Sequence, residues 1–273
     1  MVMTRLTALV LLAVGRASAV ARSGRLAGVA RRTIHVDLGR GLAVGVVEVS
    51  DWEWWDSQPA EANPFGAKLW PAAVAVARDL VALPSGTLQG MTVLELGCGN
   101  GLCSLAAAMA GAGSVVASDL SVDALALVGE AADNAQLSVD LRVLDLSNTT
   151  DPLPPAELVI AADLMYDDDL ARHVAVRVAE AARRGSWVIV ADPKRGPREA
   201  FLRKLAECGE THAFSERQTV RLDALKWKEK KVEVMHINRP ASAATRTCAL
   251  LSDELGDEEL PPEIEVGAGG GPY

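Results

Sequence analysis

The sequence has few cysteines, and none of them is spaced as a metal ligand. Its 273 residues include four cysteines, at positions 98, 103, 208 and 248. There is no C-x-x-C pair and no group of cysteines and histidines at the spacing of a zinc site. We therefore expect reduced, mostly buried thiols, with neither a disulfide framework nor a bound metal.

Acidic residues are absent from the first 36 positions, which contain six arginines. The formal charge of the whole chain is −9 at pH 7, so the remainder carries −15. A body with this charge is expected to repel nucleic acid and to attract cationic partners. A charge that only keeps the protein in solution is the alternative explanation.

The apolar run near the N-terminus is short. Residues 7–14 are apolar but too few to span a bilayer, so we expect no stable membrane insertion. Ala17, Ser18 and Ala19 resemble a signal-peptide cleavage site, and the arginine-rich stretch continues beyond them. We interpret residues 1–36 as a targeting segment: a transit peptide for a mitochondrion or plastid, a secretory signal, or a signal followed by a transit peptide. The alternative is a tail on a cytoplasmic protein.

Strands and helices are expected to alternate along most of the chain. Apolar runs predict strands at residues 42–49, 91–96, 114–118, 139–144, 158–162 and 187–191. Helical periodicity predicts helices at residues 66–83, 102–110, 122–136, 168–183 and 197–208. This alternation is typical of an α/β fold with a parallel sheet, in which ligands bind beyond the carboxyl ends of the strands.

The end of the chain departs from this alternation. Residues 211–220 and 231–237 alternate polar and apolar side chains and could pair as an antiparallel hairpin. Residues 251–273 contain seven acids, no base and a run of glycines, which is typical of a disordered tail. The predicted organisation is one Rossmann-like domain at residues 38–240, between the targeting segment and this tail.

The strongest local signal is a glycine turn after the strand at 91–96. Glu95, Gly97, Gly99 and Gly101 follow the order E-x-G-x-G-x-G. Glycines let the backbone approach a ligand closely, and the helix that follows supplies free N–H groups. A dinucleotide site needs a small residue at position 102, where this chain has leucine. The acid before the glycines favours a cationic ligand over a pyrophosphate.

This turn resembles motif I of the class I S-adenosylmethionine-dependent methyltransferases. The resemblance implies a doubly wound, mostly parallel seven-stranded sheet with an antiparallel terminal hairpin, and S-adenosylmethionine as the cofactor. It also implies that the turn cradles the amino-acid part of the cofactor and that Glu95 helps to hold it. A structural glycine turn in an unrelated α/β protein is the alternative.

Acids also follow the next two strands. Asp119 lies about twenty residues after the glycines, where an acid can accept both ribose hydroxyls. Asp145 and Leu146 follow the strand at 139–144, where class I methyltransferases typically have an acid that accepts from the adenine amine and apolar neighbours that flank the ring. Each acid could instead cap a helix or a loop.

Three further stretches resemble the protein-lysine methyltransferases of the seven-strand class. Asp163 and Tyr166 form a D-x-x-Y segment, Trp70 stands in a Trp-Pro pair that the family has near the cofactor, and Asp192 precedes a proline and a basic residue. The segment is nearest to that of the mitochondrial enzymes that modify the electron-transfer flavoprotein β subunit. The resemblance spans residues 65–208. The tryptophans at 52–55, the basic residues at 221–231 and the acidic tail have no counterpart that we can match.

The resemblance implies transfer of a sulfonium methyl group to a lysine of a protein substrate. Asp163 would receive the ammonium, and Tyr166 would hydrogen-bond the amine or close the acceptor channel. A small-molecule N- or O-methyltransferase and a non-catalytic binding module on the same fold are the alternatives. A nicotinamide-dependent oxidoreductase is disfavoured by Leu102.

Overall fold

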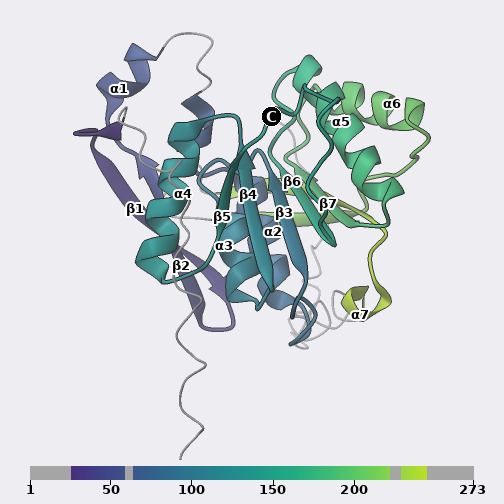
Figure 1. The fold of residues 1–273 in the computed structure, drawn as a ribbon, viewed down its shortest axis with the longest axis horizontal. Helices are drawn as coiled ribbons and strands as arrows, with labels where there is room; N and C mark the ends of the chain where they lie inside the picture. The colour runs from purple at the N-terminus through teal and green to yellow at the C-terminus, as the bar shows by residue number, and fades with distance from the viewer. Residues whose placement is uncertain (1–25, 59–63, 222–228, 245–273) are drawn as a thin grey trace, which may run out of the picture.

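A seven-stranded sheet forms the centre of the computed structural model, which describes residues 26–58, 64–221 and 229–244. The strand order is β5-β4-β3-β6-β7-β9-β8 (Figure 1). The strands are β3 (Thr92–Leu96), β4 (Ser114–Asp119), β5 (Asp140–Val143), β6 (Leu158–Ala162), β7 (Trp187–Asp192), β8 (Glu216–Arg221) and β9 (Glu229–Ile237). Strands β3 to β7 run parallel, whereas β9 is antiparallel to both β7 and β8. This arrangement confirms the predicted Rossmann-like fold and its terminal hairpin.

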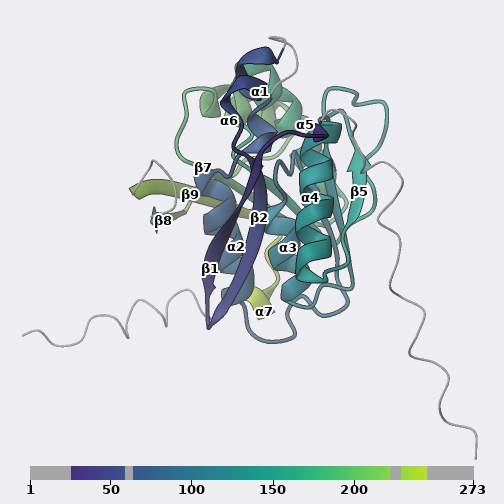
Figure 2. The same cartoon turned by 90° about the vertical axis from the view of Figure 1, so that its left-hand side faces the viewer.

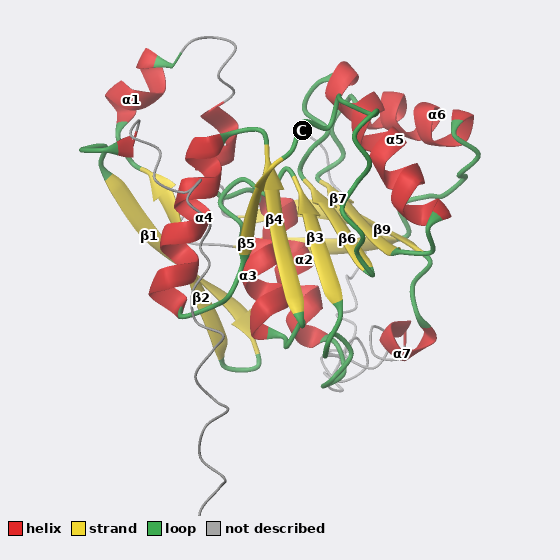
Figure 3. Ribbon diagram, in the orientation of Figure 1, coloured by secondary structure: helices red, strands yellow, loops and turns green. Residues whose placement is uncertain are grey.

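Helices cover both faces of the sheet (Figure 3). One face packs against α2 (Pro71–Ala82), α3 (Leu102–Met109) and α4 (Val122–Ala135), and the other against α5 (Asp168–Arg183) and α6 (Arg198–Glu207). The central strands are apolar on both faces because each face is buried. Thus Ile160 packs in the first cluster, whereas its neighbours Val159 and Ala161 pack in the second.

A second, two-stranded sheet comes before the seven-stranded sheet in the chain. Strand β1 (Arg31–Gly39) pairs antiparallel with β2 (Leu42–Val49). In this hairpin β1 packs on α2 and β2 packs on α3 and α4 (Figure 2). Alternate residues of β1, namely Ile34, Val36 and Leu38, are buried, and Val36 is fully buried. The folded part of the chain therefore begins before residue 36, inside the segment that was interpreted as a targeting segment. Residues 1–25 lie outside the described residues, and targeting stays a prediction for them.

The segment before α2 differs in detail from its prediction. It contains a short helix, α1 (Trp52–Ser57), and a 3-10 turn, η3 (Pro64–Ala67), where a loop and the start of a longer helix were expected. Helix α2 begins only at Pro71, because a proline disfavours helical backbone in the residue before it, and Trp70 is extended. A four-residue helix, α7 (Ala241–Ala244), follows β9. The predicted tail at 251–273 lies outside the described residues, and no helix within them is long and apolar enough to cross a membrane.

Candidate functional site

A cavity of about 700 Å³ opens at the carboxyl ends of the parallel strands. It brings together turns from five neighbouring strands in the spatial order β5, β4, β3, β6 and β7. Most of the residues predicted from the sequence line it: Trp70, Gly97, Gly99, Asp119, Asp145, Leu146, Asp163 and Tyr166. Glu95, in β3, and Gly101, at the end of the glycine turn, do not line the cavity.

The glycine turn forms the centre of the cavity wall. Gly99 has a φ of +53°, and a Cβ atom there would lie 3.3 Å from the Gly66 carbonyl oxygen. Gly101 is the N-cap residue of α3 with a φ of +74°, and a Cβ atom there would lie 2.7 Å from the methyl groups of Val128. Gly99 therefore lets the turn pack closely on the backbone of η3, and Gly101 lets α3 and α4 pack closely.

Glu95 holds this turn from behind. Its Oε2 accepts hydrogen bonds from the backbone nitrogen of Ser104 at 2.8 Å and from the Ser104 hydroxyl at 2.5 Å. The side chain is buried, and burial raises its pKa to about 7. Glu95 thus satisfies a free N–H group in the first turn of α3, and its predicted contact with a cofactor stays a prediction.

Asp119 connects the glycine turn to the start of α4. Its Oδ2 accepts from the Gly99 nitrogen at 2.9 Å, and its Oδ1 accepts from the Ser121 nitrogen at 2.9 Å. Burial raises the pKa of this carboxyl group. An ionised carboxylate has about four lone-pair positions, so Asp119 keeps acceptor capacity for hydroxyl groups of a ligand in the cavity.

The loop after β5 presents an acid between apolar side chains. Asp145 is exposed, and its Oδ1 accepts from the nitrogen and hydroxyl of Ser147 at 2.8 and 2.7 Å, which lowers its pKa. Leu144 and Leu146 on either side are buried and also line the cavity. A flat, apolar ring with a polar edge fits these groups.

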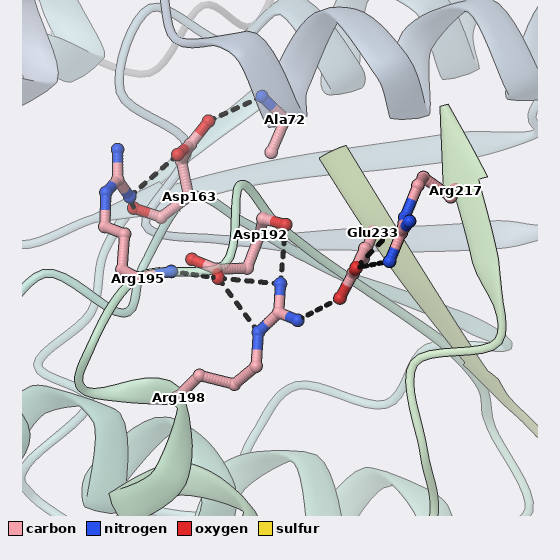
Figure 4. Close-up of polar contacts among 7 residues, drawn as sticks. All are labelled: Ala72, Asp163, Asp192, Arg195, Arg198, Arg217 and Glu233. Atoms are coloured by element: carbon pink, nitrogen blue, oxygen red, sulfur yellow. Dashed lines mark hydrogen bonds and ion pairs between the residues drawn. The ribbon is translucent and has the colours of Figure 1, made fainter. Parts of the chain in front are cut away.

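Asp163 is a buried carboxylate at the end of β6 (Figure 4). Its Oδ2 accepts from the backbone nitrogen of Ala72 at 2.6 Å, and its Oδ1 lies 2.7 Å from Nη1 of Arg195. Burial raises its pKa to about 6, although Arg195 and Ala72 oppose the shift. Its φ of +62° is unusual for a non-glycine residue, and the donation from Arg195 to its carbonyl oxygen at 3.1 Å helps to hold it. Asp163 therefore caps α2, whereas α5 is capped by Asp167.

Aromatic side chains surround this end of the cavity. The ring of Phe65 lies 6.1 Å from that of Trp70 and 5.8 Å from that of Tyr166. Phe65 and Tyr166 are 50% and 38% exposed, so their faces remain accessible. The guanidinium carbon of Arg195 lies 5.5 Å from the centre of the Trp70 ring. Such rings suit an aliphatic chain that ends in a cation.

An ion-pair network fixes the turn that carries Arg195. Asp192, at the end of β7, is fully buried, and its Oδ1 accepts from the nitrogen of Arg195 at 2.9 Å and from Nε of Arg198 at 3.0 Å. Arg198 also pairs with Glu233 on β9, which pairs with Arg217 on β8 at 2.7 Å (Figure 4). The basic turn could be predicted from the sequence because it directly follows a strand, whereas the position of Arg195 at the cavity was not predicted.

These groups fit S-adenosylmethionine. The volume suits a small organic ligand, the apolar and acidic groups after β5 suit adenine, and the carboxylate after β4 suits a ribose. Metal-binding clusters are absent from the described parts of the chain.

Comparisons with known proteins agree with this assignment. Residues 56–208, more than half of the chain, match a family described as lysine methyltransferases. The electron transfer flavoprotein beta subunit lysine methyltransferase of Rattus norvegicus is 29% identical over 146 residues, which cover 53% of this chain and 56% of that protein. The ribosomal protein L11 methyltransferase of Xanthomonas euvesicatoria is 38% identical over 101 residues, which cover 36% of this chain and 32% of that protein. The chain thus spans about half or less of the length of these relatives.

A solved structure shares the fold. It is that of a candidate RNA methyltransferase from Pyrococcus horikoshii, with a TM-score of 0.50 and 17% sequence identity. The match covers 66% of this chain and 87% of that one. At this identity the likeness shows the fold alone.

Proposed function

The chain belongs to the lysine methyltransferase family that its residues 56–208 match, and we propose that it transfers a methyl group from S-adenosylmethionine to a lysine side chain of a protein substrate. S-adenosylmethionine is the cofactor of this family. When bound, it supplies an electrophilic sulfonium methyl group. The residues of the chain then have to hold donor and acceptor in line and exclude water.

The observation that carries the proposal is the division of the cavity into two chemically different ends. Asp145 and Asp119 lie at the end formed by β5 and β4, where they suit an adenosine. Asp163 and Tyr166 lie at the end formed by β6, beside the aromatic rings. A nucleoside at the first end leaves the second end for a side chain that is apolar along its length and cationic at its tip, as lysine is.

Asp163 is the group that meets the acceptor nitrogen in this proposal. Ala72 donates to Oδ2, whereas Oδ1 is buried, pairs with Arg195 at 2.7 Å and accepts no well-oriented hydrogen bond from the described residues. Oδ1 therefore has lone pairs left for an ammonium group. Arg195 helps to keep the buried carboxylate ionised, and the backbone of Ala72 fixes its orientation. Tyr166 borders the channel with its ring and brings a hydroxyl group close to the amine.

The acceptor must lose a proton before it reacts, because only the neutral amine has a free lone pair. Free lysine titrates near pH 10.4, and transfer into an apolar channel lowers that value. We propose that the proton leaves to water or to Asp163. The pKa of Asp163, raised to about 6 by burial, makes its carboxylate a better proton acceptor than an exposed aspartate.

The test is a labelling experiment with the purified full chain, methyl-labelled S-adenosylmethionine and an extract of mitochondria or plastids. The acid-free N-terminal segment favours these organelles as the source of substrate. We expect label in methyllysine of a protein band with the wild type and with Asp167→Asn, which changes an acid outside the cavity, and its loss with Asp163→Asn. Label confined to small molecules would favour a small-molecule methyltransferase, and absence of any label would contradict methyl transfer.

A further inference from the structure

Arg177 on α5 is a fully buried cation that does not line the cavity. Its guanidinium has five N–H groups, and five acceptors surround it. They are the carbonyl oxygens of Leu146 at 3.2 Å, Asp151 at 2.8 Å, Asp145 at 3.5 Å and Asn148 at short range, and Oε2 of Glu180 at 2.9 Å. Donors and acceptors therefore match in number.

The four carbonyl groups belong to one loop. Residues 144–157, between β5 and β6, contain no helix or strand, so this loop lacks a ladder of backbone partners. The carbonyl oxygens of Asp145 and Asn148 also accept from amides of the loop. Arg177 on α5 is a donor from outside the loop that bonds to all four carbonyl oxygens. The same helix brings Leu170 and His173 to the cavity. Arg177 thus joins the loop to a helix that borders the site.

We infer that Arg177 is a positioning residue for the adenine end of the cofactor. Two of the carbonyl groups that it holds belong to Asp145 and Leu146, whose side chains line the cavity. Fixing these two peptide units fixes the direction in which the acid and the apolar side chain point. The inference rests on the proposed function, because it takes the ligand of this loop to be an adenine nucleoside.

The inference is tested by the selectivity of binding, which a merely structural role would not change. S-adenosylhomocysteine and S-inosylhomocysteine differ at the 6-position, where an amine is replaced by a carbonyl oxygen. A positioned Asp145 carboxylate accepts from the amine and repels the carbonyl. We expect the wild type to prefer the adenosyl compound by about tenfold or more, since one charge-assisted hydrogen bond is at stake.

Arg177→Lys keeps the charge but removes the planar fork. Calorimetry should show about tenfold weaker binding of S-adenosylhomocysteine and a preference below about threefold. Arg184→Lys is the matched control. Arg184 also pairs with Glu180, at 2.6 Å, but it donates to the carbonyl oxygen of Leu153, which is not one of the four that Arg177 binds. This control should keep both the affinity and the preference.

A second readout needs no ligand. The amides of Asn148 and Asp151 bond to carbonyl oxygens within the loop, and their hydrogen exchange should accelerate in Arg177→Lys but not in Arg184→Lys. If Arg177→Lys does not fold, Glu180→Gln, which weakens the hold on Arg177, should still reduce the preference.

The inference would be overturned, and the proposed function left intact, if folded Arg177→Lys kept the wild-type preference for the adenosyl compound and the wild-type rate of hydrogen exchange. If Arg177→Lys does not fold, the same result with Glu180→Gln would overturn it. Failure of the wild type to bind S-adenosylhomocysteine would overturn the proposed function, and the inference with it.

Discussion

Asp163 is buried and caps α2, and it also lines the cavity, so two substitutions are needed to separate these roles. Asp163→Asn keeps an oxygen that can accept from Ala72 but removes the charge that pairs with Arg195. We expect near-wild-type affinity for the cofactor and a methylation rate reduced by several hundred-fold, on the order of 3–4 kcal/mol. Asp163→Ala also removes the cap of α2, which should cost a further 1–2 kcal/mol or so of stability. Calorimetry, urea unfolding and single-turnover rates measure the three quantities, and full activity of folded Asp163→Asn would remove Asp163 from the mechanism.

Glu95 makes the stability of the protein depend on pH. Because its pKa is raised from 4.5 to about 7 in the folded state, the folded state binds more protons than the unfolded state between these values. The contribution of Glu95 to stability therefore decreases as the pH rises from about 4.5 to 7 and stays constant above. Glu95→Gln retains an acceptor for Ser104 and removes the charge. At pH 8 the variant should be at least as stable as the wild type, and at pH 5 it should have no advantage.

Urea unfolding at both pH values measures this difference, and cofactor affinity should stay within about threefold of the wild type because Glu95 lies behind the cavity wall. A large loss of affinity in a stable Glu95→Gln would instead support the role that the family resemblance implies, a contact with the cofactor.

Single residues show where sequence-based prediction stops. The acids after the strands were predictable, because parallel strands bring their carboxyl ends to one edge. The partners of Asp163 were not, because Ala72 and Arg195 lie 91 and 32 positions away. Arg177 gave no signal either: a lone arginine in a helix is normally at the surface, and only the fold shows that its side chain is fully buried, together with Val174 and Val178.

At the scale of helices and strands, prediction was closest where an apolar pattern had clear ends. Strand β6 and helix α5 have the predicted bounds, Leu158–Ala162 and Asp168–Arg183. Strand β1 was missed because residues 1–36, which include its first six residues, are rich in arginine and free of acids, which indicated a targeting segment. Yet Ile34, Val36 and Leu38 alternate with polar residues as a half-buried strand does. The composition of this segment indicated a targeting segment, whereas its periodicity indicated a strand. The strand forms because its apolar side chains pack against α2.

Two truncations test the boundary that β1 sets. A chain that starts at residue 26 keeps the whole hairpin and should unfold at the wild-type denaturant concentration. A chain that starts at residue 37 loses Ile34 and Val36, both of which are buried. Each such side chain contributes about 1.5–3 kcal/mol, so several kcal/mol of stability should disappear. Equal midpoints of urea unfolding for the two truncations would show that β1 adds nothing to the fold.

For the whole molecule, the identity of the cofactor can be read from ligand-linked stability. A ligand that binds only the folded state at 100 times its dissociation constant stabilises it by about 2.7 kcal/mol, which corresponds to roughly 5–10 °C in Tm for a domain of this size. S-adenosylhomocysteine should produce such a shift. NAD should produce none, because Leu102, fully buried at the start of α3, occupies the position where a dinucleotide turn needs a small residue. Gly99→Arg should fold but lose the response to S-adenosylhomocysteine, since its side chain would crowd the cavity wall near Gly66. The opposite result would be a Tm shift with NAD that persists in Gly99→Arg, and no Tm shift with S-adenosylhomocysteine in the wild type. It would mean that the cavity binds a different cofactor from the one its family uses.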